Sequence, residues 1–237
     1  MKTAIVTGGS KGIGLAVARM LVGRGYKVYA TYAHDDSSAI HAETDSQGRI
    51  VFFKADHSDR TQTYDFVDYV KENVEQIDCI VCNAGITVRH SFAETTDREW
   101  DAMMEVALNS HFIILREFFP LISTGARILF TGSAMAIYPH ATVLGYGVSK
   151  SAVHSMAENL VKVFEEKQAT VNVIAPGFVE TEWHRNKLED IRQNICRKTA
   201  IHRFATTDEI VNAFEFCLDN EFVNGSVIEV NGGYSYK

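Results

Sequence analysis

The chain has 237 residues with a formal net charge of −7 at pH 7, and 46% of its residues are hydrophobic. This acidic balance without a basic stripe argues against binding to a nucleic-acid backbone, because nucleic-acid-binding proteins concentrate lysine and arginine on one face. No run of about 18 apolar residues could span a bilayer, and no apolar leader segment opens the chain. We therefore expect a cytoplasmic protein with no nucleic acid and no membrane among its partners.

Short apolar runs alternate with amphipathic stretches, which predicts strands alternating with helices along the whole chain. Strands are expected near residues 3–7, 27–32, 50–54, 78–82, 127–132, 170–175 and 226–230. Helices are expected near residues 12–24, 61–75, 97–119, 147–166 and 207–219. This order predicts an α/β fold with a parallel sheet of about seven strands and helices on both faces. No linker or repeat interrupts the pattern, so residues 1–237 are expected to form a single domain.

The first expected strand leads through a glycine-rich turn into the first expected helix. The turn reads Gly8-Gly9-Ser10-Lys11-Gly12-Ile13-Gly14. Glycines allow a tight turn and close approach of the backbone, while the N-terminus of a helix offers free N–H groups and the positive end of its dipole to a pyrophosphate. Strand, turn and helix together predict a dinucleotide site in a doubly wound sheet of the Rossmann type.

Tyr146 and Lys150 lie four residues apart at the start of the expected helix 147–166, where residues i and i+4 share a face. A free phenol has a pKa of about 10, which is about 3 units too high for proton transfer near pH 7, and closing that gap takes ~4 kcal/mol. A cation about 4 Å away supplies on the order of 4 kcal/mol at an effective dielectric of about 20. We therefore expect Lys150 to lower the pKa of Tyr146 and make it a proton donor.

The cysteines and histidines do not predict a metal site. Cys79 and Cys82 are three residues apart in an expected strand, an odd separation that sends their side chains to opposite faces. We expect both to be buried as small hydrophobic residues. The histidines show no metal-ligand spacing and are expected to be mostly surface or helix residues.

Three motifs occur in order: Thr-Gly-x-x-x-Gly-x-Gly from Thr7 to Gly14, Asn83-Ala84-Gly85 after a strand, and Tyr146-x-x-x-Lys150. Together these motifs resemble those of the short-chain dehydrogenase/reductase family. Their residues are similar to those of the 3-oxoacyl-acyl-carrier-protein reductases within that family. Further matches extend the resemblance over essentially the whole chain: Asp56, Thr131-Gly132-Ser133, Pro176 to Thr181 and Val230 to Gly233.

The resemblance implies catalytic roles for Ser133, Tyr146 and Lys150. Tyr146 would be the general acid in reduction and the base in oxidation, and Ser133 would position the carbonyl oxygen. The cofactor-binding residues that the resemblance implies are Gly8, Ser10, Lys11, Gly12, Ile13, Gly14, Asp56, His57, Asn83, Ala84, Gly85, Tyr146, Lys150, Val179 and Thr181. Simpler structural roles remain open: Ser133 as a strand-end cap, Asp56 as a turn former and Thr181 as a helix cap. The polar segment 182–203 lies where the family keeps a substrate lid.

The sequence departs from the family at Ala107. The family carries an asparagine there, in a pattern that this chain matches from Trp100 to Leu108 without a gap. The resemblance implies that the asparagine holds a water linking the active-site lysine to solvent, and alanine has no hydrogen-bonding group. Asn109 is no substitute, because two residues along a helix is about 200° around it. Ala107 is either a natural variant with another proton route or an introduced substitution, and in both cases catalysis is expected to be impaired.

Two functions stay open. The first is an NAD(P)(H)-dependent oxidoreductase that acts on a small-molecule ketone or secondary alcohol, with steroid, sugar, polyol and acyl substrates all possible. The second is a catalytically weak dinucleotide-binding regulator or scaffold, since fold does not imply function. Retention of Ser133, Tyr146 and Lys150 favours the enzyme, and Ala107 favours the regulator.

NADP(H) is expected over NAD(H). A site for NAD usually places an acid at the end of the second strand, and here that position is Tyr32. Lys11 in the phosphate loop could meet a 2′-phosphate, while Asp35 and Asp36 follow closely and could reverse the preference.

A homo-oligomer, a tetramer by resemblance, is also expected. The helices 97–119 and 147–166 carry more large apolar residues than one sheet face needs, and in relatives these helices pair across two-fold axes. The residues in question are Phe112, Ile113, Phe118, Phe119, Met156, Leu160, Val163 and Phe164.

Overall fold

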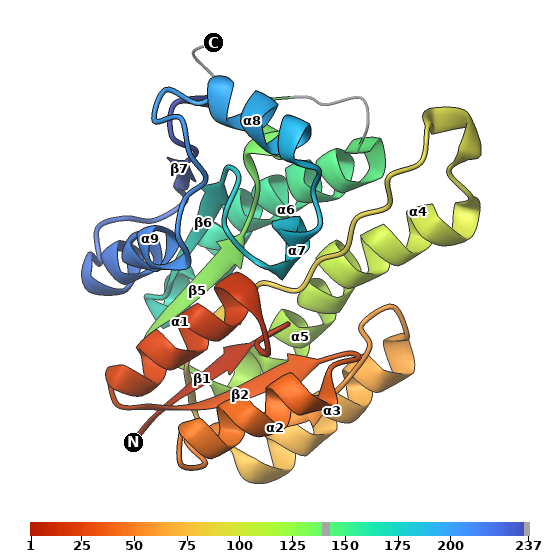
Figure 1. The fold of residues 1–237 in the computed structure, drawn as a ribbon. Coiled ribbons are helices and arrows are strands. Elements are labelled where there is room, and N and C mark those ends of the chain that lie inside the picture. The colour runs from red at the N-terminus through yellow and green to blue at the C-terminus, as the bar shows by residue number, and fades with distance from the viewer. Residues whose placement is uncertain (139–142, 235–237) are drawn as a thin grey trace.

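Seven strands form one sheet in the order β3-β2-β1-β4-β5-β6-β7 (Figure 1). They are β1 (Lys2–Val6), β2 (Tyr26–Tyr32), β3 (Ile50–Lys54), β4 (Ile77–Cys82), β5 (Ile122–Thr131), β6 (Thr170–Pro176) and β7 (Val227–Val230). The computed structural model describes residues 1–138 and 143–234. Every neighbouring pair of strands runs parallel. The predicted seven-strand parallel sheet is therefore confirmed.

Helices cover both faces of this sheet. They are α1 (Gly12–Gly23), α2 (Asp36–Asp45), α3 (Arg60–Asn73), α4 (Asp97–Met104), α5 (Ser110–Phe118), α6 (Leu144–Val163), α7 (Glu182–Arg185), α8 (Glu189–Arg197) and α9 (Thr207–Asp219). Helices α1 and α9 pack on one face and against each other, whereas α3, α5 and α6 pack on the opposite face (Figure 1). No helix within the described residues is long and apolar enough to cross a membrane.

The strands are apolar on both sides because each side faces a separate core. Ile5 of β1 belongs to the core under α3, α5 and α6, whereas its neighbours Ala4 and Val6 belong to the core under α1 and α9. Successive side chains of a strand point to opposite faces. This arrangement explains why the strands appear in the sequence as continuous apolar runs.

The direction of winding changes beside β1. Ala4 of β1 pairs with Val28 of β2 on one side and with Cys79 of β4 on the other. In such a sheet the crevice at the carboxyl ends of the two strands flanking the change is the usual ligand site. Gly8 follows β1, and Asn83 follows β4, so the fold brings both motifs to this crevice.

The helices differ from expectation in four places, and the first is that α7 and α8 lie in the segment 182–203, where no helix was expected. The expected helix 97–119 contains a π-helical segment, Glu105–Asn109, between α4 and α5. Helix α2 was not predicted, because its buried side is formed by Ala39 and Ala42 alone, too little apolar surface to give a periodic pattern. Helix α6 begins at Leu144, a few residues earlier than expected, so that Tyr146 lies within its first turn.

Candidate active site

A cavity of about 290 Å³ opens at the carboxyl ends of the strands. Thirteen of the expected site residues line it: Gly8, Lys11, Gly12, Ile13, Gly14, Asn83, Ala84, Gly85, Ser133, Tyr146, Lys150, Val179 and Thr181. Four others lie outside this lining: Ser10, Tyr32, Asp56 and His57. The fold thus gathers residues from β1, β4, β5, α6 and the segment after β6 around one space.

The glycine turn has no room for side chains. Gly8 has a φ of +65°, and a Cβ atom there would lie 3.2 Å from the Cα of Ala84. A Cβ atom on Gly14 would overlap the carbonyl oxygen of Gly8. Lys11, the N-cap of α1, makes no side-chain cap hydrogen bond. The first N–H groups of α1 are therefore left for an anion such as a phosphate.

Hydrogen bonds of Thr7 and Asn83 join the glycine turn to β4 and β5. The Thr7 hydroxyl accepts hydrogen bonds from the backbone N–H groups of Asn83 and Ala84, both at 2.9 Å. The Asn83 amide donates to the carbonyls of Thr7 and Gly8 at 3.0 and 3.1 Å, and accepts from the Thr131 hydroxyl at 3.0 Å. Because these groups bind one another, Asn83 fixes the shape of the cavity floor.

Ser133, Tyr146 and Lys150 meet where β5 ends and α6 begins. Ser133 caps a short helical turn, and its hydroxyl accepts from the N–H of Met135 at 3.1 Å. Lys150 lies one turn after Tyr146, with its Nζ 5.9 Å from the centre of the phenol ring. That Nζ donates to the carbonyl oxygen of Thr131 at 2.6 Å. Sequence reasoning expected this convergence of three side chains on one cavity.

The acidity of Tyr146 differs from expectation. Burial raises the pKa of Tyr146, and a hydrogen bond with Ser133 opposes the rise only in part. Burial also lowers the pKa of Lys150, to about 8. The prediction that Lys150 lowers the pKa of Tyr146 is therefore wrong for the protein without ligands. The cation is directed at the Thr131 carbonyl, and both groups lose hydration, a cost that sequence spacing does not reveal.

His57 and Asp56 are both engaged within the protein. The His57 ring is buried, with Nε2 2.9 Å from the Thr31 hydroxyl and Nδ1 2.9 Å from the Thr63 hydroxyl. Burial lowers its pKa to about 4. Asp56 accepts from the N–H and hydroxyl of Ser58 at 2.9 and 2.8 Å, the geometry of a turn former. The His57 ring thus faces the interior of the protein.

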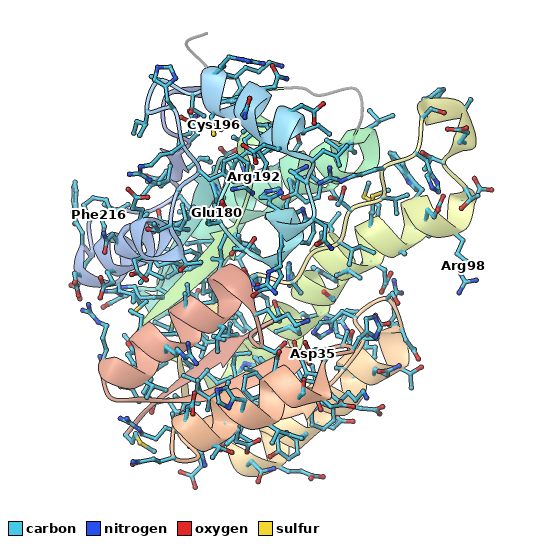
Figure 2. All side chains as sticks on the ribbon, in the orientation of Figure 1. Asp35, Arg98, Glu180, Arg192, Cys196 and Phe216 are labelled. Atoms are coloured by element: carbon cyan, nitrogen blue, oxygen red, sulfur yellow. The ribbon has the colours of Figure 1, made fainter. Side chains whose placement is uncertain are left out.

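Lys11 is paired with Asp35. Its Nζ lies 2.5 Å from a carboxylate oxygen of Asp35, which also caps α2 by accepting from the N–H of Ser38 at 3.0 Å. Figure 2 shows Asp35 between the end of β2 and the start of α2. The Lys11 hydrogen bond, with help from Ser38, lowers the pKa of this carboxylate far below its usual range. A 2′-phosphate near Lys11 would therefore compete with Asp35.

Ala107 is buried in the π-helical segment, and His111 follows it by four residues. The Asn109 side chain donates to Glu105 at 2.7 Å, so it does not replace the missing asparagine. His111 is fully buried, with Nε2 3.0 Å from the Thr7 hydroxyl. Since that hydroxyl already accepts two N–H groups, it donates to Nε2, and the His111 proton resides on Nδ1. Sequence reasoning placed His111 among surface or helix residues and missed this contact, although its i+4 spacing from Ala107 indicates a shared face.

A second cavity of about 330 Å³ adjoins the first. The two share Ser133, Tyr146, Pro176, Gly177, Trp183 and His184. The Trp183 ring lies 6.1 Å from that of Tyr146. Helices α7 and α8 form one side of this cavity, within the segment 182–203 where a substrate lid was expected. Sequence reasoning did not single out Trp183, His184 or Arg89, because nothing in their local pattern marks them.

Comparison with known proteins gives a consistent result. The family model for short chain dehydrogenases matches residues 2–192. A 2-dehydro-3-deoxy-D-gluconate 5-dehydrogenase of Pseudoalteromonas atlantica is 31% identical over 242 residues, which cover 98% of this chain and 95% of that protein. A 3-oxoacyl-acyl-carrier-protein reductase of Escherichia coli is 29% identical over 237 residues, which cover 98% of this chain and 96% of that protein.

Solved structures agree with the sequence relatives. A short chain dehydrogenase from Burkholderia cenocepacia in complex with NADP has a TM-score of 0.92 at 27% identity, covering 99% of this chain and 98% of that chain. A blue fluorescent protein from a metagenomic library in complex with NADPH has a TM-score of 0.93 at 26% identity, with the same coverage. With a family model matched from β1 into α8 and a dinucleotide crevice at the change of winding, this chain belongs to the short-chain dehydrogenase family of oxidoreductases, which bind a nicotinamide dinucleotide.

Proposed function

We propose that this chain interconverts a small-molecule ketone and its secondary alcohol with a nicotinamide dinucleotide. The observation that carries the proposal is the position of Ser133 and Tyr146, which line both cavities at once. The first cavity has the uncapped helix N-terminus that suits a pyrophosphate. The second adjoins it and suits a small substrate, since ligand pockets begin at about 300 Å³.

The cofactor would be held by the residues that the glycine turn and its neighbours present. We infer that Gly8, Ser10, Lys11, Gly12, Ile13, Gly14, Asn83, Ala84 and Gly85 hold the phosphates and the adenosine side, and that Lys150, Val179 and Thr181 meet the nicotinamide side. Tyr32, Asp56 and the backbone of His57 would border the adenosine. When bound, the nicotinamide supplies or accepts the hydride.

Tyr146 is proposed as the general acid. The phenol is protonated at neutral pH and can donate to a carbonyl oxygen, while burial, which raises its pKa, makes it a weaker acid. Ser133, hydrogen-bonded to the phenol, would position that oxygen. Lys150, with a pKa lowered to about 8, would carry its charge near neutral pH beside the developing phenolate.

The test of this function is Tyr146→Phe. We expect kcat for ketone reduction to fall at least a hundredfold, because general acid catalysis typically contributes 10²–10⁴-fold, which is roughly the loss expected here. The dissociation constant for NADPH should stay within about threefold, since that change is under 1 kcal/mol. Tyr64→Phe, which removes a hydroxyl that accepts a hydrogen bond from Arg116 at 2.8 Å, is the matched control.

Two results of this test would contradict the proposal. Equal rates for Tyr146→Phe and the unchanged protein would remove Tyr146 from catalysis. Cofactor binding without oxidation of NADPH or NADH by any ketone of a broad panel would favour the alternative, a dinucleotide-binding regulator. Ala107 is the one feature that favours that alternative.

NADP(H) is the proposed cofactor over NAD(H). Tyr32 at the end of β2 supports this choice, as do the two structural neighbours solved with NADP and NADPH. The Lys11–Asp35 pair opposes it, because Asp35 offers a carboxylate near the end of β2. We expect NADPH to bind about tenfold more tightly than NADH, the scale of one charge-assisted hydrogen bond. Calorimetry that finds equal or tighter binding of NADH would reverse the choice.

A homotetramer is proposed for the assembly. Phe112 on α5 and Val163 at the end of α6 are 51% and 53% exposed, which supports pairing through these helices. The other apolar residues expected at an interface are less available, since Ile113, Phe118 and Phe164 are buried in the monomer. Light scattering at micromolar concentration is expected to give the mass of four chains, and a monomeric mass would refute the proposal.

A further inference from the structure

The second cavity presents positive charge to a ligand and no negative charge. Arg89, Lys187 and Lys198 line it, whereas none of its described lining residues is an aspartate or a glutamate. The three cations come from separate segments: the loop after β4, the junction of α7 and α8, and the residue after α8. The fold therefore collects positive charge beside Ser133 and Tyr146, which line the same cavity.

These three cations lack acidic partners in the described part of the chain. Every ion pair of the neighbouring segment uses other residues. Glu180 pairs with Arg192 of α8, as Figure 2 shows, and Glu182 pairs with Arg185 at 3.2 Å. Glu180 and Glu182 thus pair with other arginines, and no described acid forms an ion pair with Arg89, Lys187 or Lys198, whose charges remain available to a ligand.

Arg89, Lys187 and His184 lie close enough together for their charges to change the pKa values of Lys187 and His184. Burial, and after it the Arg89 guanidinium, lowers the pKa of Lys187. Burial, together with the nearby charges of Lys187 and Arg89, lowers the pKa of His184 to about 4. Like charges placed together without a counter-ion repel each other. An anion bound between Arg89 and Lys187 would remove that repulsion.

The same cavity contains unsatisfied polar atoms. Among the described residues, four buried side-chain atoms have no hydrogen-bond partner, and two of them, the Thr87 hydroxyl and His184 Nδ1, belong to residues lining this cavity. Buried polar groups are nearly always hydrogen-bonded in folded proteins. Partners for Thr87 and His184 are therefore expected from a bound molecule.

The rest of the lining is apolar. Met135, Phe178, Ile191 and Ile195 lie on it together with Trp183. Such a surface suits the aliphatic part of a ligand. A molecule that complements the whole lining thus has a carbonyl, an aliphatic part and an anionic group.

We propose that the substrate is a small carbonyl compound that bears an anionic group, with the carbonyl at Ser133 and Tyr146 and the anion between Arg89 and Lys187. This inference rests on the proposed function, because it takes Tyr146 as the group that meets the carbonyl. It narrows the substrate class from ketones in general to oxo-acids or phosphorylated ketones.

The experiment compares ketones that differ only in charge. One pair is 4-oxopentanoate and its methyl ester, and the other is dihydroxyacetone phosphate and dihydroxyacetone. We expect kcat/KM to favour the anionic member of at least one pair by about tenfold, the scale of one hydrogen bond to a charged group. The preferred pair identifies the anion as a carboxylate or a phosphate.

Arg89→Gln and Lys187→Gln test the two cations. Each is expected to reduce the ratio of kcat/KM between anionic and neutral ketone about fivefold to tenfold, mainly through KM, because an interaction remote from the reacting carbonyl is the same in ground and transition states. Arg185→Gln is the matched control. It removes a cation of the same segment that is paired with Glu182 and does not line the cavity, and it should leave the ratio unchanged.

A binding measurement separates failure of this inference from failure of the proposed function. Calorimetry with the enzyme and NADP⁺ should show tighter binding of the anionic ketone, weakened by Arg89→Gln and Lys187→Gln, even if no ketone is reduced. Reduction of neutral and anionic ketones at equal kcat/KM, or equal binding of both, would overturn the inference while leaving the oxidoreductase function in place. A preference for the anion that both variants leave intact would overturn the assignment to Arg89 and Lys187.

Discussion

The two sides of the active site differ in how far their polar groups are hydrogen-bonded within the protein. On the side of β1 and β4, polar groups mostly bind one another: Thr7, Asn83 and Thr131 form a hydrogen-bonded network that His111 joins through Nε2, and among the described atoms of this network His111 Nδ1 alone has no partner. On the side of α7 and α8, Arg89 and Lys187 have no described acidic partner, and Thr87 and His184 carry unsatisfied atoms. The first side thus has one unsatisfied atom in an otherwise hydrogen-bonded network, whereas the second offers two unsatisfied atoms and two cations without a described acidic partner to a ligand. The side of β1 and β4 is called the rigid side below. This difference suggests that the rigid side binds the cofactor common to the family, and that the side of α7 and α8 binds a particular substrate.

Thr7→Val should show how much the rigid side contributes to stability. The substitution leaves the N–H groups of Asn83 and Ala84 without the acceptor that they use now. Buried unsatisfied groups cost about 1–3 kcal/mol each, so we expect a loss of about 3 kcal/mol in the free energy of unfolding. Thermal unfolding should shift down by about 6–12 °C for a domain of this size.

Thr170→Val is the control for this prediction. Thr170 is also buried, but its hydroxyl has no partner among the described residues. The same change of side chain should leave the melting temperature unchanged or raise it. Equal destabilisation by both variants would mean that the Thr7 network does not contribute more than an isolated hydroxyl.

Acid should weaken the rigid side through its buried histidines. The folded pKa of His57 is about 4, below its ordinary value of about 6.5. Between these values the unfolded chain binds more protons, so stability is lost as the pH falls from about 6.5 towards 4. At pH 5 the loss from His57 is about 2 kcal/mol, and His111, whose pKa burial also lowers, adds to it.

Urea unfolding at pH 7 and pH 5 measures this loss. His57→Gln should reduce the difference between the two pH values by about 2 kcal/mol. His41→Gln, at a position whose side chain is 77% exposed, should leave the difference unchanged. A difference that is the same in all three proteins would show that His57 is not held in the neutral form.

Ala107→Asn tests proton supply to the catalytic groups on the rigid side. Ala107 does not line the cofactor cavity, so cofactor affinity should be unchanged. If the missing amide limits the rate, kcat should rise at least about tenfold, the lower part of the range for general acid–base effects. Ala107→Val, which adds bulk without a hydrogen-bonding group, should give no gain. An unchanged kcat for Ala107→Asn would show that protons reach Lys150 by another route.

Lys187→Gln should have the smallest effect on stability. Lys187 has no described acidic partner, and Arg89 nearby disfavours its charge. Removing that charge is expected to change the free energy of unfolding by less than about 0.5 kcal/mol, as for most surface substitutions. Differential scanning calorimetry should show a melting temperature equal to or slightly above that of the unchanged protein. A clear decrease in the melting temperature would mean that Lys187 contributes to stability, and the two sides of the site would then differ less than described here.

The rigid side could be predicted from sequence because its motifs encode local geometry. Each motif requires a particular backbone conformation or helical spacing, and both can be recognised in a single sequence. These motifs are the glycines of the turn, Asn83 and the Tyr146–Lys150 pair. The parallel sheet followed from the alternation of elements for the same reason. Ser133, which follows β5, could be predicted through the resemblance to the short-chain dehydrogenase/reductase family.

The features that escaped prediction depend on three-dimensional packing. Arg89 and Lys187 are nearly a hundred residues apart, and only the folded chain brings them to one cavity. The raised pKa of Tyr146 depends on burial depth, and the inward-facing ring of His57 depends on Thr31 and Thr63 being on both sides. No local residue pattern marks the π-helical segment Glu105–Asn109 around Ala107.

Trp183 makes the active site visible to fluorescence. The chain has two tryptophans, and both adjoin the start of α6: the ring of Trp183 lies 6.1 Å from that of Tyr146, and a Cβ atom on Gly145 would lie 3.6 Å from Trp100. Intrinsic emission therefore reports the catalytic region, whereas far-ultraviolet circular dichroism reports all the helices. If the two signals change at different denaturant concentrations, the site opens before the fold does, and unfolding is not two-state.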